Sequence, residues 1–220
     1  MHKTSRPKVK ICCISSLVEA RMAISHGADA IGLVSEMPSG PGIIPEEQIA
    51  EIAASVPPGI KTFLLTSKQD TKSIIDQQLR CGVTTLQLVD RLENGSYRDL
   101  QDALPGILIV QVVHVLGRKS IEEAESVAPF VDAVLLDSGN PRKSTKELGG
   151  TGRTHNWKLS KTICERLEIP IYLAGGLTTD NVSRAVQDVG PYGLDVCSGV
   201  RTNGRLDESK LAKFFAQVRC

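Results

Sequence analysis

The chain has 220 residues, and its 26 basic and 25 acidic side chains leave a formal net charge of +1. This balance gives no indication of nucleic acid or of an anionic membrane as a partner. No apolar run approaches the roughly 20 residues of a membrane span. The basic start lacks the longer apolar segment and cleavage site of a signal peptide. We therefore expect a cytoplasmic protein.

Apolar runs rich in β-branched residues alternate with helical patterns along the chain. The runs that predict strands are 8–14, 30–34, 60–66, 84–89, 108–114, 131–137, 171–174 and 194–197. The helical patterns open at Ser15 or Ser16, Pro45, Asp70, Tyr97, Ser120, Trp157, Asp180 and Asp207. Ser120 and Glu123 have the spacing of a capping box, and residues 138–156 form the longest loop.

These elements make eight βα units without a break in composition, which predicts one domain over residues 1–220. Strict alternation indicates a parallel sheet, because parallel neighbours need crossover helices. A doubly wound open sheet is the competing architecture. The count of eight and the loops of the last two units favour a closed (β/α)8 TIM barrel of the α/β class.

Six cysteines are scattered through the chain without the C-x-x-C spacing of zinc or thioredoxin-like sites. They are Cys12, Cys13, Cys81, Cys164, Cys197 and Cys220. The sequence therefore predicts no metal site, and a reducing compartment keeps such thiols free.

Small residues follow the last two predicted strands: Gly175 and Gly176, then Ser198 and Gly199. Glycine has no Cβ, so its backbone can approach a ligand closely. Thr178 or Thr179 is expected to cap the next helix, whose free N–H groups and dipole attract an anion. A single Gly-Gly pair would indicate only a tight turn. Two such loops in tandem predict a phosphate site.

Three ionisable residues stand at strand ends, where barrel active sites lie. Cys12 follows Lys10 by two residues, so the two side chains lie on the same face of the strand, about 7 Å apart. A nearby ammonium group favours the thiolate form of a cysteine, and a thiolate can act as base or nucleophile. The alternative is that Cys12 only fills space. Asp137 ends an apolar run with no helix close enough to cap, which favours a function. Asp195 likewise lies on a predicted strand, the eighth, and the alternative to a function is that it forms only a structural salt bridge.

Several motifs occur in a characteristic order on these eight units. They are 9–12 with 27–32, 135–138, 149–152 preceding Trp157, 173–178 and 195–200. In this order the chain resembles the phosphoribosylanthranilate isomerase family of tryptophan biosynthesis over nearly its whole length.

The resemblance implies an Amadori rearrangement of a phosphorylated sugar amine without cofactor or metal, in a monomer or homodimer. Asp137 would be the general acid that opens the furanose ring, and Cys12 the general base that removes the C2′ proton. Gly175, Gly176, Ser198 and Gly199 would hold the phosphate. The loop 149–152, with Gly150 and Thr151, would fold over the site, and Asp195 would contact the substrate.

Three departures from the family pattern stand out. The loop 36–44 carries no cation where the family usually has an arginine near the substrate's carboxylate, Val89 replaces a histidine, and Cys13 replaces a glycine. Either another cation binds the carboxylate, or the ligand has none there. The candidates to replace the missing groups, each alternatively a solvated surface group, are Arg142, Lys143, Arg153, Arg201 and His114.

Three functions remain open at this point. The leading one is the isomerase of this family. A second keeps the acid–base pair but uses another phosphosugar amine, because the loop 38–44 is uncharged. The third is a barrel that binds a phosphosugar without turnover, although a binder needs neither Cys12 nor Asp137.

Overall fold

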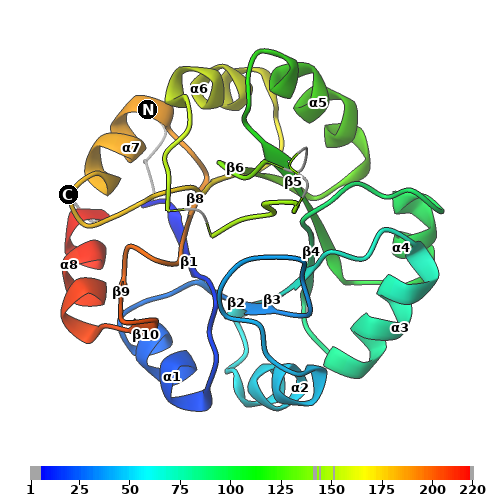
Figure 1. The fold of residues 1–220 in the computed structure, drawn as a ribbon, viewed down its shortest axis with the longest axis horizontal. Coiled ribbons are helices and arrows are strands. Elements are labelled where there is room, and N and C mark those ends of the chain that lie inside the picture. Colours follow the sequence, from blue (N-terminus) through cyan, green and yellow to red (C-terminus); the bar gives the residue numbers. More distant parts are fainter. Residues whose placement is uncertain (1–5, 141–142, 144, 151, 219–220) are drawn as a thin grey trace.

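The computed structural model describes residues 6–140, 143, 145–150 and 152–218. Eight parallel strands follow one another around a closed barrel, and the last pairs with the first (Figure 1). The strands are β1 (Lys8–Ile11), β2 (Ala30–Val34), β3 (Lys61–Thr66), β4 (Thr85–Leu88), β5 (Leu108–His114), β6 (Ala133–Asp137), β7 (Ile171–Leu173) and β8 (Gly193–Val196). The closed (β/α)8 barrel is therefore confirmed, and the open doubly wound sheet is wrong.

Helices surround the barrel on the outside (Figure 1). They are α1 (Leu17–Ser25), α2 (Glu46–Ser55), α3 (Thr71–Cys81), α4 (Tyr97–Ala103), α5 (Lys119–Val127) with the 3-10 turn η1 (Ala128–Phe130), α6 (Trp157–Arg166), α7 (Val182–Val189) and α8 (Glu208–Val218). A hairpin of β9 (Arg201–Thr202) and β10 (Arg205–Leu206) separates β8 from α8. No helix in the described part of the chain is long and apolar enough to cross a membrane.

The first strand is shorter than the sequence predicts. β1 ends at Ile11 rather than residue 14, because Cys13 has φ 62° in the left-handed region, which strand residues do not adopt. Cys12 still donates its N–H to the carbonyl of Val196 at 2.8 Å, so the barrel ladder runs one residue past the strand. The chain then enters α1, where the Ser16 hydroxyl caps the helix as one of the two expected serines.

The predicted capping box at Ser120 is wrong. The fifth helix already begins at Lys119, and the Ser120 hydroxyl accepts from the Leu116 N–H and donates to the His114 carbonyl, both at 3.1 Å. Ser120 therefore ties the end of β5 to the following turn. The Ser120 side chain does bond to the backbone, as short polar side chains often do, but its partners precede the helix and do not belong to it.

The predicted start of the seventh helix is also wrong. This helix begins at Val182, beyond Thr178 and Thr179, and the Asn181 side chain accepts from the Thr178 N–H at 2.8 Å. The Thr178 hydroxyl in turn accepts from the Asp180 N–H. These bonds form a polar turn between β7 and the helix, so the first free N–H groups of α7 lie several residues after the glycine pair.

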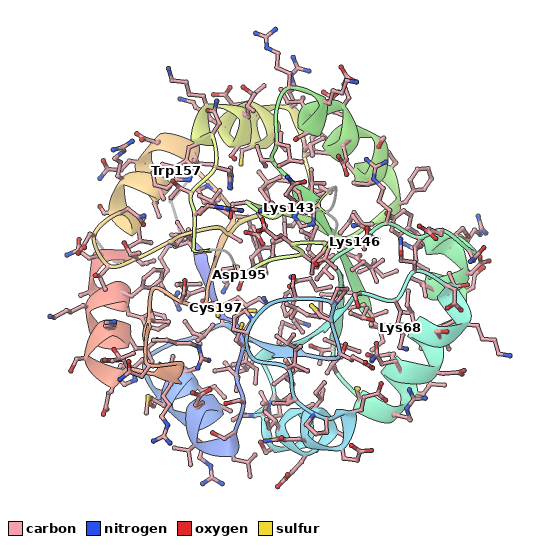
Figure 2. All side chains as sticks on the ribbon, in the orientation of Figure 1. Lys68, Lys143, Lys146, Trp157, Asp195 and Cys197 are labelled. Atoms are coloured by element: carbon pink, nitrogen blue, oxygen red, sulfur yellow. The ribbon has the colours of Figure 1, made fainter. Side chains whose placement is uncertain are left out.

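Apolar side chains fill two layers, as the alternation of side chains along a strand requires. One layer lies between strands and helices and includes Ile11, Leu33, Leu64, Leu136 and Leu194. The other fills the barrel interior and includes Phe63, Leu65, Val110, Val112 and Leu135. Asp195 and Cys197 lie near the centre of the ring, while Trp157 lies at the periphery by α6 (Figure 2). The polar residues of interest therefore sit within an otherwise apolar barrel.

Candidate functional site

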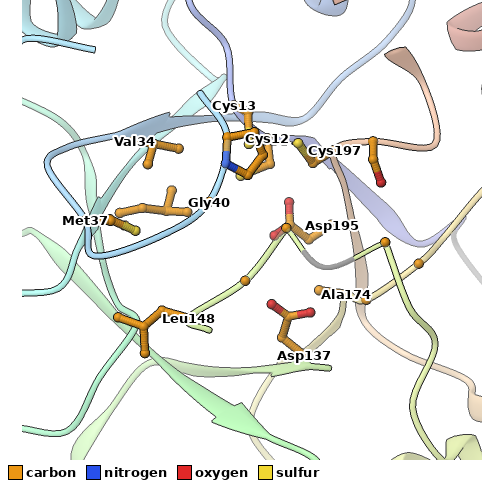
Figure 3. A pocket seen from close by; sticks show the side chains of 18 of the residues that line it. Cys12, Cys13, Val34, Met37, Gly40, Asp137, Leu148, Ala174, Asp195 and Cys197 are labelled. Atoms are coloured by element: carbon orange, nitrogen blue, oxygen red, sulfur yellow. Dashed lines mark hydrogen bonds between the residues drawn. The ribbon is translucent and has the colours of Figure 1, made fainter. Parts of the chain in front are cut away.

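A pocket opens where the barrel strands end (Figure 3). Its titratable lining residues are Cys12, Cys13, Asp137, Asp195 and Cys197. An apolar wall of Val34, Met37, Leu65 and Leu148 faces them, and Gly175, Gly176 and Ser198 line a third side. The pocket thus combines proton-transfer groups, an apolar slot and a side lined by small residues.

The structure brings Cys12 and Asp137 to the same pocket, as the sequence predicts. Cys12 lies just past β1 and Asp137 is the last residue of β6, so both emerge from the strand ends. In Figure 3 the carboxyl group of Asp195 lies between them. The residues that face the cavity can therefore contact one bound molecule.

Asp195 forms a buried ion pair with Lys10. The Lys10 Nζ is 2.9 Å from the Asp195 Oδ1, and their side chains are 0% and 8% exposed. The barrel register explains the pairing, because Lys10 and Asp195 are partners on β1 and β8. Burial disfavours the ammonium charge, but Asp195 and then Cys12 outweigh it and raise the pKa of Lys10. The salt bridge considered as an alternative for Asp195 therefore exists, and the residue lines the pocket as well.

Cys12 is held close to the same lysine. A Cβ on Gly32 of β2 would lie 2.9 Å from both the Cys12 Sγ and the Lys10 Nζ. The sulfur and the ammonium group therefore both pack over a residue without a side chain. Only glycine leaves room for both atoms at this point of the barrel.

Asp137 is buried at the base of the pocket, with a side chain that is 7% exposed. Burial raises the pKa of its carboxyl group, and the charge of Asp195 adds to this rise. The Ser138 N–H donates to its Oδ1 at 2.7 Å and acts in the opposite direction, as does His114. The net direction is upward, which favours a protonated carboxyl group that can donate a proton.

The small residues after β7 and β8 lie side by side. Thr178 and Gly199 form a parallel bridge between the two loops, and a Cβ on Gly199 would lie only 1.9 Å from the Leu177 carbonyl. Gly175, Gly176 and Ser198 line the pocket, whereas Gly199 packs behind them. Gly175 and Gly176 have φ of 81° and 62°, so their amides take directions that side-chain-bearing residues rarely adopt.

The loop after β6 covers the pocket. Gly149 lies against Asp137, since a Cβ there would be 3.0 Å from its Oδ2, and Gly150 packs against Pro41 of the loop after β2. Gly152 approaches the Ser198 hydroxyl. Thr151 lies outside the described residues.

The cations considered as carboxylate partners point to acidic groups elsewhere. Lys143 and Arg153 both bind Glu147, at 2.5 and 2.6 Å. Arg201 binds Glu19 at 2.8 Å and is 9% exposed, so it faces the protein and not the pocket. Arg142 lies outside the described residues. Among the described residues that line the pocket, none carries a positive charge.

His114 does not line this pocket. Its Nε2 is 3.1 Å from the Val89 carbonyl, and the ring faces an adjoining hollow at the ends of β4 and β5. Gly139 packs against the other ring nitrogen, since a Cβ there would lie 2.5 Å from Nδ1. The histidine therefore ends β5 beside Asp137, its register partner on β6, but faces the adjoining hollow and not the pocket.

The model of the N-(5′-phosphoribosyl)anthranilate (PRA) isomerase family matches residues 9–217. The chain belongs to the PRA isomerase family. The isomerase of Methanosarcina acetivorans is 32% identical to it, in an alignment of 228 positions that covers 98% of this chain and 94% of that protein.

Solved structures of PRA isomerases share the fold. One, in complex with reduced 1-(o-carboxyphenylamino)-1-deoxyribulose 5-phosphate, has a TM-score of 0.77 and 26% identity, covering 97% of this chain and 98% of that one. Another is a structure of monomers generated from the dimeric enzyme of Thermotoga maritima. It has a TM-score of 0.78 and 25% identity, with the same coverage.

Two features of this PRA isomerase family member were missed by sequence reasoning. Cys13 and Cys197 line the pocket with their sulfur atoms 2.8 Å apart. Arg201 was only one of several candidate partners for a substrate carboxylate or a solvated surface group, yet it donates to the backbone carbonyls of Cys12 and Cys13. The only available signal was Cys13, which stands where the family has glycine.

Proposed function

We propose that the chain catalyses the Amadori rearrangement of N-(5′-phosphoribosyl)anthranilate in tryptophan biosynthesis. The observation that carries the proposal is one pocket lined by a thiol, a carboxyl group whose pKa is raised, and the small residues Gly175, Gly176 and Ser198. These groups match the three tasks of the reaction, which are proton donation, proton removal and retention of a phosphate.

Asp137 is the general acid. It donates its proton to the furanose ring oxygen as the bond from that oxygen to C1′ breaks, which opens the ring to an iminium ion. Burial raises the pKa of Asp137, so the carboxyl group keeps its proton at a pH where an ordinary aspartate has lost it.

Cys12 is the general base. Its thiolate removes the proton from C2′, and the resulting enolamine tautomerises to the 1-amino-1-deoxyketose phosphate. The side chains of Cys12 and Lys10 pack together over Gly32, which leaves room for both. The ion pair with Asp195 fixes the Lys10 ammonium group in place.

The phosphate binds at Gly175, Gly176 and Ser198, and the aromatic ring lies against Val34, Met37, Leu65 and Leu148. In this orientation the sugar spans the floor of the pocket between Cys12 and Asp137. The loop with Gly149 and Gly150 covers it and excludes water from the iminium ion.

The test is steady-state turnover of phosphoribosylanthranilate by the wild type, Cys12→Ser and Asp137→Asn. Each substitution is expected to lower kcat about 10²–10⁴-fold, the usual contribution of one acid or base. Cys164→Ser, at a half-buried thiol of α6 that does not line the pocket, is the matched control and keeps full activity. Turnover that both pocket substitutions leave unchanged contradicts the assignment.

A second candidate is the same reaction on a phosphoribosyl amine without a carboxylate. It is favoured by the lack of a positive charge among the described lining residues. A charge-assisted hydrogen bond contributes roughly 1.5–3 kcal/mol, or about ten- to a hundredfold in binding. Comparing kcat/KM for the anthranilate and aniline compounds decides between the two. A clear preference for anthranilate rejects the second candidate.

The location and assembly complete the proposal. A cytoplasmic enzyme is consistent with the free thiols Cys12, Cys13, Cys81, Cys164 and Cys197. It acts as a monomer or homodimer, and light scattering of the purified protein distinguishes these states.

A further inference from the structure

Two thiols face each other where the barrel closes between β1 and β8. The sulfur atoms of Cys13 and Cys197 are 2.8 Å apart, although the residues are 184 positions apart in the chain. A disulfide bond is about 2.05 Å long, so a small movement of two side chains joins them. Both residues are free thiols in the structure.

The surrounding backbone holds this approach in place. The left-handed turn at Cys13, with φ 62°, carries its side chain across the seam toward β8. Arg201 donates to the Cys13 carbonyl at 2.6 Å and to the Cys12 carbonyl at 3.2 Å. Gly42 packs on the other side, since a Cβ there would lie 2.5 Å from the Cys13 Cβ. The pair is therefore pre-organised and not a chance contact of mobile groups.

The two thiols differ in their ionisation. The hydrogen bond with Cys13 lowers the pKa of Cys197, with a further contribution from the charge of Arg201 against the effect of burial. Hydrogen bonds to Cys12 and Cys197, together with burial, raise the pKa of Cys13. Cys197 is also the more exposed of the two and lines the pocket. It is thus the nucleophile of the pair, and Cys13 is the thiol that follows.

We propose that Cys13 and Cys197 form a reversible disulfide in reaction with a peroxide and so staple the seam of the barrel. The Cys197 thiolate attacks one peroxide oxygen, the O–O bond breaks, and a sulfenic acid and hydroxide form. The Cys13 sulfur then attacks the sulfenic sulfur, the S–O bond breaks, and water leaves with the Cys13 proton. In sum two thiols are oxidised and one hydrogen peroxide is reduced to two waters. A dithiol reverses the step by exchange.

Two consequences follow from the position of the bond. It closes a loop of nearly the whole chain, which restricts the unfolded state and raises thermal stability. It also takes up the thiol of Cys13, the chain neighbour of Cys12. The proposal does not depend on the isomerase activity, because its readouts are thiol content, connectivity and melting temperature.

The experiment treats the full chain with hydrogen peroxide under native conditions and quantifies thiols, intact mass and Tm. The wild type is expected to lose two thiols and two hydrogens of mass, and its Tm rises and returns with dithiothreitol. Cys13→Gly is the main variant, because glycine accepts the left-handed turn without strain. It forms no internal disulfide and instead accumulates a sulfenic acid at Cys197 that dimedone traps.

Two further variants make the result specific. Cys197→Ser removes the Tm rise, whereas Cys164→Ser behaves as the wild type. Cys12→Ser still forms the Cys13–Cys197 disulfide. Fragmentation spectra identify this bond and distinguish it from a Cys12–Cys197 bridge. Unchanged thiol content in the wild type, or equal loss of two thiols in Cys13→Gly, overturns the proposal.

Discussion

The guanidinium group of Arg201 donates a 2.6 Å hydrogen bond to the backbone carbonyl of Cys13, across the seam where the barrel closes. The same group binds Glu19 of α1, which also accepts the N–H of Leu206. Together with the Lys10–Asp195 pair, these contacts join the first and last βα units by buried polar interactions. The turn that carries Cys12 is therefore positioned by the far end of the chain.

Replacing Arg201 by Met is expected to destabilise the fold by about 3–5 kcal/mol, because it leaves the Glu19 carboxylate buried without its partner. Urea unfolding measures the loss. The exposed pair of Arg98 with Asp102 supplies the control, and Arg98→Met changes stability by no more than about 0.5 kcal/mol.

The double variant Arg201→Met/Glu19→Gln isolates the cause. Removing both charges is expected to recover part of the lost stability, since no charge then stays unpaired. A double variant as unstable as Arg201→Met alone would contradict the ion pair as the source of the effect.

Asp137→Asn is expected to stabilise the protein at pH 8 by roughly 1–3 kcal/mol, the cost of a poorly compensated buried polar group. Burial raises the pKa of Asp137 in the folded state. The carboxyl group therefore contributes fully to folding stability at a pH below the ordinary aspartate pKa, and this contribution is lost as the pH rises through the raised pKa. The difference between variant and wild type should therefore shrink as the pH falls through the raised pKa toward the ordinary aspartate pKa, and should stay constant below it. A difference that does not depend on pH would contradict this account.

The turnover of the same enzyme should show the raised pKa as well. Because Asp137 must be protonated to open the ring, kcat/KM is expected to fall on the alkaline side as this group loses its proton. The measurement is the rate profile from pH 5 to 10 for the wild type. Asp137→Glu, which retains an ionisable group, should move this limb, whereas Cys164→Ser should leave it in place.

Gly32→Ala tests the space shared by Cys12 and Lys10. The added methyl group would lie 2.9 Å from both side-chain atoms, which is expected to cost about 1–3 kcal/mol of stability and to lower kcat by displacing the thiol. Gly117→Ala is the matched control, because a Cβ there meets nothing within 4 Å. If both variants turn over at the wild-type rate, the packing around Cys12 does not position it.

His155 should make stability depend on pH below 7. Burial lowers its pKa to about 4, from an ordinary value of 6.5. The unfolded chain therefore binds more protons over this range, and folding loses roughly 3 kcal/mol between pH 7 and 4 through this group. His155→Gln, whose amide can still bond Ser160, is expected to lose that part of the dependence. Equal acid sensitivity of the two proteins in urea unfolding would rule out His155 as its source.

The chain order of strands and helices was predictable because each element carries its own pattern. Val110 and Val112 face the barrel interior while Ile109 and Val113 face the helices, and this arrangement reads as a continuous apolar strand. Eight such runs with helices between them leave few architectures open. The exact starts of the fifth and seventh helices were not predictable, because Ser120 and Thr178 have several possible backbone partners within a few residues.

The sequence by itself determined the barrel, the two loops of small residues and the strand-end positions of Cys12 and Asp137, since these depend on local patterns and on the meeting of parallel strand ends. Only the tertiary structure decided that Lys10 pairs with Asp195, that Arg201 turns inward to Glu19, and that Cys13 meets Cys197. Each of these pairs is separated by more than 180 residues. Their contacts arise from the register with which β8 closes on β1, and no local pattern encodes that register.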